Sequence, residues 1–377
     1  MNSLIVPRIT TPAMLAFELG RDHARYGVTP ILRQAYDSPA LRSGLVAGRA
    51  SAGQRPRSAT RAVQLWLKLR LQAWCEGQSV EPVQVTPRYV QQLEVSHCPI
   101  TRAPLDANDP LCGDAVVARV RHDAAYAAGN LAVLSTKALR ASSGITRVQA
   151  EELSRRLAAE SQSGTGGLGG LTAAQWARAA TLLSFVEPLT HEQACVQPLR
   201  VLPPNRLRLF NPAQALQAFV SRQLLVPGWS LRMSRIEALL PAKVAQRGFQ
   251  TFFHALLPRV LEVGRNLAAH EQRWAVEDAW RQPLVQQRWW AFARQLSAAQ
   301  CETLVVRAHA KRLGQGLVHA LSDRAAVDGW DLKQQGQVSA DSRVRCTSTR
   351  RTMHPESRWS APSAMQHASR QAVLPMQ

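Results

Sequence analysis

The sequence is short of acidic residues. It contains 26 Asp and Glu against 46 Lys and Arg, so its formal net charge is +20 and its isoelectric point is about 11.1. A chain with this charge attracts polyanions, and nucleic acid is the commonest polyanion inside cells. The composition therefore predicts a nucleic-acid partner; the alternative is a basic protein without that role. Lysine is also scarce, and its positions are Lys68, Lys137, Lys243, Lys311 and Lys333.

Long apolar runs are missing as well. No uninterrupted apolar stretch reaches the roughly eighteen residues of a membrane-spanning helix, so we expect no membrane partner. The first residues, MNSLIVPRITTP, lack the basic and apolar regions of a signal peptide. Six scattered cysteines are typical of a reducing compartment. We therefore expect a cytoplasmic protein, with association with the nucleoid as a further expectation.

The motifs of several enzyme classes are absent. The sequence has no Gly-x-Ser-x-Gly elbow, no His-Glu-x-x-His pair and no dinucleotide-binding Gly-x-Gly-x-x-Gly after a strand. The glycine-rich segment SQSGTGGLGG, residues 161–170, lacks the lysine of a phosphate-binding loop, and we interpret it as a linker. No cofactor is predicted, although zinc or a divalent metal stays open for one segment considered below.

The residues that are present predict a mainly α-helical fold. A hydrophobic content of 46% and ten Trp indicate a folded protein, and 377 residues suffice for two domains or more. Capping boxes such as Thr172 with Gln175 begin several periodic stretches, and Pro258 is expected to interrupt one of them. The predicted organisation is an N-terminal region (1–160), the linker (161–170), a helical domain (171–330) and a disordered basic tail (331–377).

Two segments near the N-terminus contrast in pattern. Residues 60–74 carry an apolar stripe of helical spacing, which predicts a helix. Residues 38–60 are rich in Ser, Ala, Gly, Arg and Pro, and we predict a mobile arm there. No acid occurs from Ala40 to Cys75. This stretch is either a solvated face or a surface that contacts phosphates.

Residues 97–140 look like a site rather than a scaffold. Cys98-Pro-Ile-Thr is typical of a tight knuckle, and residues 115–121 form an apolar, β-branched run that suits a strand. Tyr126-Ala-Ala-Gly-Asn favours a turn because Gly and Asn tolerate positive φ. Residues 131–134 can return as a second strand, and a helix can start at Thr136. The predicted order is knuckle, strand, turn, strand and helix, which we call the finger.

The finger resembles the HNH (ββα-metal) endonuclease family. The resemblance rests on the Cys98 knuckle, on Arg119-Val120 late in the first strand, and above all on Tyr126-x-x-Gly-Asn-Leu. It covers about 45 residues and implies a small treble-clef or HNH-like finger embedded in a helical protein. In that family a strand histidine acts as general base on a water, and a bound divalent cation stabilises the leaving oxygen.

The sequence departs from the family at the catalytic positions. Ala118 and Arg119 stand where the acidic residue and the histidine are expected, and neither accepts a proton at neutral pH. His122 and Asn130 are the remaining weak catalytic candidates. For a metal, His97, Cys98, Cys112 and His122 could supply four ligands, but their spacing matches no standard zinc motif. The alternative is buried thiols and surface histidines.

Three functions follow from these observations. The leading one is a nucleic-acid-binding protein with a finger that does not cleave, and DNA is favoured over RNA. The others are a divergent metal-dependent nuclease and a helical protein-interaction module with a structural finger. If the protein is an enzyme at all, we expect a nuclease. The residues predicted to contact phosphates are Arg55, Arg57, Arg61, Arg119, Arg121, Lys137 and Arg140.

Overall fold

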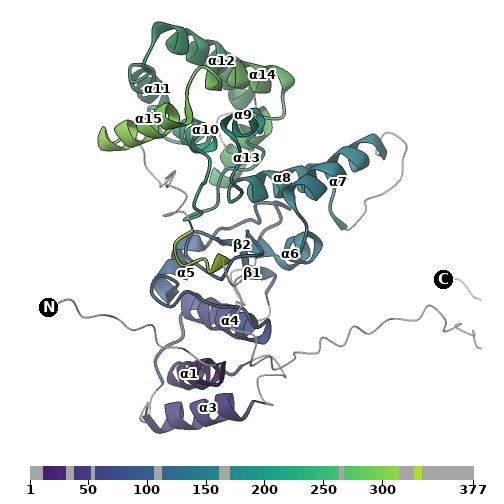
Figure 1. Cartoon of the computed structure of the whole chain (residues 1–377), viewed down its shortest axis with the longest axis vertical. Helices are drawn as coiled ribbons and strands as arrows, with labels where there is room; N and C mark the ends of the chain where they lie inside the picture. Colours follow the sequence, from purple (N-terminus) through teal and green to yellow (C-terminus); the bar gives the residue numbers. More distant parts are fainter. Residues whose placement is uncertain are drawn as a thin grey trace, which may run out of the picture. The chain divides into compact units, whose positions relative to one another are not determined.

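A computed structural model describes residues 12–30, 38–51, 56–105, 113–160, 170–262, 267–313 and 327–332. All of them lie in one compact unit, residues 1–344. This part of the chain is mainly helical and contains a two-stranded sheet (Figure 1), as the sequence predicted. No described helix is long and apolar enough to cross a membrane.

The first half of the chain holds short helices and both strands. In chain order these are α1 (Pro12–Arg25), α3 (Pro39–Ser51), α4 (Arg61–Cys75), α5 (Pro87–Leu93), β1 (Ala115–Arg119), β2 (Leu131–Ser135), α6 (Thr136–Ser142) and α7 (Arg147–Glu160). The named elements of the second half are all helices among its described residues. Its elements are α8 (Ala173–Ser184), α9 (His191–Val196), α10 (Pro212–Gln223), α11 (Trp229–Glu237), α12 (Lys243–Leu261), α13 (Ala269–Ala279), α14 (Pro283–Ala293) and α15 (Ala298–Ala310).

The prediction of a mobile arm at 38–60 was wrong for its first half, which forms α3. The glycines that suggested a loop are packing residues. A Cβ on Gly44 would overlap the carbonyl oxygen of Phe17, and one on Gly48 would meet the backbone of Arg21. Glycine therefore allows α3 to lie against the backbone of α1. We call α1 and α3 the N-terminal helix pair.

Helix α4 has two buried faces, which explains its wide apolar stripe. Val63, Leu67 and Leu71 belong to small clusters shared with the segments around α1 and α3. Leu65 and Leu69 belong to the main core together with the finger. The helix thus joins the N-terminal helix pair to the rest of the protein. Thr60 caps its first turn through a hydrogen bond from the Val63 amide.

The finger contains the predicted antiparallel strands followed by a helix. β1 pairs with β2 from Ala115 opposite Ser135 to Arg119 opposite Leu131. β1 stops at Arg119 because the Asn130 side chain, rather than a second strand, accepts the Arg121 amide. The Ser135 hydroxyl then caps α6 by accepting the Ala138 amide.

The C-terminal helices pack around aromatic rings. The Phe252 ring on α12 lies 5.3 Å from that of Trp280 and 5.1 Å from that of Trp289. The expected interruption at Pro258 was wrong, because α12 continues to Leu261. Pro258 cannot donate to the carbonyl of His254, and the helix continues for only three residues beyond it.

One core runs through both halves of the chain. Leu65, Val133, Trp176 and Phe252 belong to the same cluster of buried side chains. The sequence also missed Trp330, which is fully buried and donates from its indole to the carbonyl of Ala128 in the finger. The boundary proposed at 161–170 stays a prediction, since residues 161–169 lie outside the described part, as does most of the tail (333–377).

Candidate nucleic-acid interface

The knuckle forms as a tight hairpin. The amide of Cys98 donates to the carbonyl of Ala103 at 2.9 Å, and the amide of Arg102 donates to the carbonyl of Cys98 at 2.8 Å. Arg102 adopts a φ of 61°, a left-handed conformation uncommon for a side-chain-bearing residue. Thr101, at the place of a second knuckle cysteine, shares a hydrogen bond of 3.3 Å with Ser135 at the start of α6. Two hydroxyls therefore link the knuckle to the helix.

The four candidate metal ligands do not assemble in the described part of the chain. His97 stacks on the His270 ring, with centroids 4.1 Å apart, and Cys98 is fully buried. His122 is held by a hydrogen bond to the backbone of Ser142, and Cys112 lies outside the described residues. No group of three or more His, Cys, Asp or Glu side chains suited to a metal occurs among the residues described.

The two weak catalytic candidates have structural partners. Asn130 is fully buried; its side chain accepts the Arg121 amide at 2.7 Å and donates to the carbonyls of Arg121 and Ala125 at 3.0 Å each. All of these bonds close the turn of the finger. Burial, and then the charge of Arg119, lower the pKa of His122. At neutral pH this imidazole is therefore uncharged.

The turn itself is covered by other parts of the protein. Gly129 has a φ of 89°, and a Cβ there would overlap the Arg208 side chain. Its amide donates to the Tyr89 hydroxyl at 2.7 Å. Trp330 lies over the same turn, with its carbonyl accepting from Ala125. A substrate therefore has no access to the Asn130 side chain in this conformation.

Arg119 is used inside the finger. Its guanidinium lies 4.8 Å from the centre of the Tyr126 ring and 3.5 Å from the carboxylate of Glu76. It also donates to Gln78 at 2.8 Å and to the carbonyls of His122 and Ala124 at 2.8 and 3.0 Å. The side chain is 12% exposed. Its donors stabilise the loop after β1, and few remain for a phosphate.

Arg121 and Arg61 are also paired with acids. Arg121 makes a two-pronged contact with Asp123, with N–O distances of 2.8 and 3.0 Å. Arg61 lies 3.3 Å from Glu94. Both charges are thus partly neutralised before any ligand binds. Arg55, another predicted phosphate contact, lies outside the described residues.

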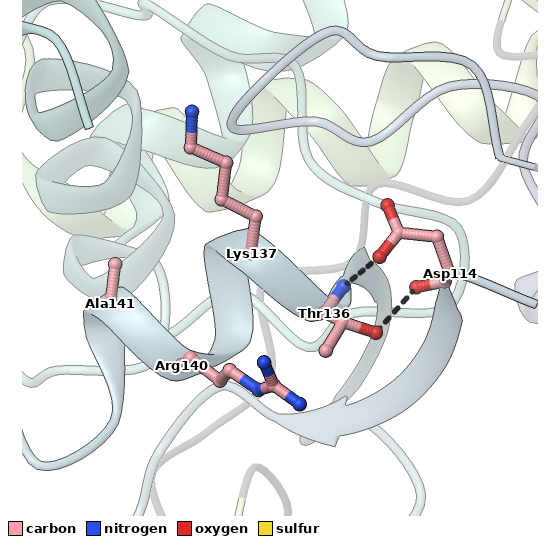
Figure 2. A pocket seen from close by; sticks show the side chains of 5 residues that line it. All are labelled: Asp114, Thr136, Lys137, Arg140 and Ala141. Carbon is pink, nitrogen blue, oxygen red and sulfur yellow. Dashed lines mark hydrogen bonds between the residues drawn. The ribbon is translucent and has the colours of Figure 1, made fainter. Parts of the chain in front are cut away.

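Lys137 and Arg140 line an open hollow of about 510 Å³ beside α6. Both are exposed, and neither forms an ion pair with a described residue. Figure 2 shows the two basic groups extending from α6 in different directions, with Asp114 at the start of the helix. Asp114 accepts the Thr136 amide at 2.8 Å, so its carboxylate occupies the helix start. The hollow is therefore lined by two basic side chains that have no acidic partner among the described residues. It is also lined by Asp114, whose carboxylate already accepts a hydrogen bond.

No protein-family model, curated protein or solved structure matches this chain. The HNH resemblance therefore still rests on the residues of the finger alone. Any assignment of function must come from the chemistry of the side chains.

A set of exposed arginines lies on the N-terminal helix pair and just after it. Sequence reasoning named Arg57 but missed Arg21 and Arg25 on α1. Their spacing with Met14 and Phe17 marks a helix face opposite the buried Ala16, Leu19 and His23. None of the set forms an ion pair with a described residue. The set, called the pair arginines, is Arg21, Arg25, Arg42, Arg49 and Arg57.

Backbone contacts bring the pair arginines close to one another. The amide of Arg57 donates to the carbonyl of Arg25 at 2.9 Å. The backbone of Arg21 lies against Gly48, the residue before Arg49. The backbones that carry Arg21, Arg25, Arg49 and Arg57 therefore lie close together, although these residues are far apart in sequence. Two acids, Glu18 and Asp22, also lie on α1, and Asp22 is paired with Arg70. None of the five arginines makes an ion pair with a described residue, so their charge is open to an external anion.

Proposed function

We propose that this protein binds DNA through the pair arginines, with Lys137 and Arg140 as a second contact, and does not cleave it. The observation that carries the proposal is the set of exposed arginines on the N-terminal helix pair that make no ion pair with a described residue. The net charge of +20 supports it, because the whole chain attracts a polyanion before any contact forms.

The expected binding mode follows from the residue types. Arginine forks match phosphate oxygens, and each phosphate neutralised releases counterions from the duplex. Contacts of this kind position a protein on DNA without reading its bases. We therefore expect binding that is tight at low salt, sensitive to salt and nearly independent of sequence.

The proposed lack of cleavage is supported by the finger. Asn130 closes the buried turn, and His122 is bound to the end of α6. Ala118 and Arg119 offer no acid or base on β1. We therefore propose that the HNH-like finger is a structural element at the centre of the fold.

The test is equilibrium binding to a fluorescent duplex at about 50 mM salt, a range where phosphate contacts dominate. The five pair arginines are changed together to Gln. A matched variant loses five exposed arginines elsewhere, so that both proteins carry the same net charge. These control positions are Arg155, Arg156, Arg235, Arg247 and Arg259.

The proposal predicts a loss of at least tenfold in affinity for the pair variant and a much smaller loss for the control. Equal losses would mean that overall charge alone drives binding. No binding by the unchanged protein to DNA or RNA would favour a protein-interaction role. Nicking of a supercoiled plasmid with Mg²⁺ or Mn²⁺, abolished by His122→Ala, would favour the nuclease.

A further inference from the structure

Arginines gather where the knuckle meets α8 and α13. Arg178 on α8 is 8% exposed, and its Nε donates to the carbonyl of Ile100 at 2.7 Å. Arg102, two residues further along the knuckle, donates to both carboxylate oxygens of Asp278 at 2.7 and 2.9 Å. The amide of Arg281 donates to the carbonyl of Asp278 at 2.9 Å. The knuckle turn is thus bound to α8 through Arg178 and to the end of α13 through Asp278.

Arg200 approaches the same face of α8 from the loop after α9. The carbonyl of Pro198 accepts the Arg200 amide at 2.9 Å and the Thr181 hydroxyl at 3.3 Å. Thr181 stands three residues after Arg178, which places both on one side of the helix. The Nε of Arg200 is enclosed and has no partner among the described residues.

The acids near this group are already engaged. Asp278 is bound by Arg102, and Glu277 accepts hydrogen bonds from Arg102, from Arg273 and from the amide of Leu202. Glu151, whose charge reaches Arg200, is bound by Arg147 at 2.7 Å. The two acids whose charge reaches Arg178, Glu277 and Asp278, thus already accept hydrogen bonds from other residues, and neither makes an ion pair with Arg178.

The positive charges influence one another. Burial first, and then the charge of Arg102, lower the pKa of Arg178 to about 10; Glu277 and Asp278 oppose this shift, and Arg281 adds to it with a smaller weight. Burial and the charge of Arg281 lower the pKa of Arg200. The terminal nitrogens of Arg178 have no described partner and are not among the fully enclosed atoms, so they reach solvent.

We propose that Arg178, Arg200 and Arg281 form a binding site for an oxyanion of the phosphate class. Guanidinium forks match the oxygens of such an anion, and a shared anion relieves the repulsion between like charges in a partly buried site. The ligand is either a free phosphate or the terminal phosphate of a nucleic acid. The site is separate from the pair arginines and does not depend on them.

The test is thermal unfolding of the full chain in inorganic phosphate and in chloride at equal ionic strength. The unchanged protein should show a saturable rise in Tm with phosphate. Arg281→Gln and Arg200→Gln should lose that rise. In chloride alone Arg281→Gln should melt at the same or a higher temperature, because a repulsive charge is removed. Arg288→Gln, an exposed arginine on α14, is the control and should keep the phosphate response.

Absence of a phosphate-specific rise in the unchanged protein would overturn the proposal, and so would an equal rise in the Arg200→Gln, Arg281→Gln double variant. Two oligonucleotides, one with a 5′-phosphate and one with a 5′-hydroxyl, distinguish a free phosphate from the terminal phosphate of a nucleic acid as the ligand. Tighter binding of the phosphorylated strand, abolished in Arg281→Gln, would identify a nucleic-acid end. Equal binding of both strands, with the phosphate response intact, would identify a free anion. Loss of DNA binding in the variant that lacks the five pair arginines bears on the proposed function alone, because those arginines are not part of this phosphate site.

Discussion

The finger and the N-terminal helix pair are both rich in arginine, yet they use it differently. In the finger, Arg119 and Arg121 find acids within the same fold, Glu76 and Asp123. On the helix pair, arginines such as Arg42 have no described acidic partner. The number of arginines in a segment therefore says little about binding. The availability of an arginine for an anionic ligand depends on whether the fold already pairs its guanidinium with an acid.

The largest effect should come from breaking the finger at its centre. Asn130→Ala removes three hydrogen bonds in a fully buried turn and leaves backbone groups unpaired. We expect a loss of about 3–5 kcal/mol in the free energy of unfolding, since each unpaired buried group costs about 1–3 kcal/mol. Urea denaturation measures this loss. Asn205→Ala, whose amide makes one long bond of 3.4 Å, is the control. Similar losses for both would contradict a central role of the turn.

The next effect tests the packing of the N-terminal helix pair. Gly44→Ala places a methyl group against the backbone of Phe17, and α3 must move away from α1. Overpacking of this kind costs about 1–3 kcal/mol. Ser43→Ala, an exposed neighbour on the same helix, should be nearly neutral. If both variants unfold at the unchanged urea concentration, the close approach of the two helices is not a feature of the protein in solution.

A comparison within the finger should distinguish Arg119 from Arg121 by their contributions to stability. Arg119→Gln removes an ion pair, a ring contact and several hydrogen bonds at a side chain that is 12% exposed, and we expect a loss of about 2 kcal/mol. Arg121→Gln breaks a pair with a half-exposed Asp123, which is worth at most about 1 kcal/mol. Chemical denaturation of both variants checks the order. The reverse order would show that the internal contacts of Arg119 do not form.

The smallest effect concerns pH and the helix pair. His23 on α1 is buried, and its Nδ1 lies 3.0 Å from the carbonyl of Val28. Burial, followed in weight by the opposing hydrogen bond to Val28, leaves its pKa lowered from 6.5. The folded protein thus binds this proton less readily than the unfolded chain, so stability present above pH 6.5 is lost as pH falls towards the folded pKa.

His23→Gln should flatten this part of the profile between about pH 7 and pH 5, the window in which histidine titrates. The measurement is Tm against pH for both proteins. An unchanged slope in the variant would show that His23 does not sense pH in the fold.

Local patterns in the sequence predicted local structure well. The capping box of Thr172 and Gln175, the knuckle at Cys98 and the strand pairing around Gly129 all form as expected. Each depends on residues close in sequence. The helix at 39–51 was missed because its glycines are explained only by the distant backbone of α1.

The candidate site was harder to predict for the same reason. Nothing local to Arg119 shows that Glu76 and Gln78 lie beside it, because they come from the loop after α4. The pairing of Arg121 with Asp123 was visible in the sequence, since the two stand only two positions apart. Arg21 and Arg25 could have been found from the helical spacing of α1, which leaves them opposite its buried face.

The central claim is that the pair arginines, with Lys137 and Arg140 as a second contact, bind phosphates, whereas Arg119 and Arg121 do not. The most direct test is the slope of log K against log salt for binding to duplex DNA, which changes by about 0.9 for each phosphate that the protein no longer neutralises. Replacing the five pair arginines by Gln should flatten the slope by up to about 4.5, Lys137 and Arg140 together by up to about 2, and Arg121 by less than about 0.5. A slope that Arg121→Gln flattens as much as the five pair substitutions do would contradict the account.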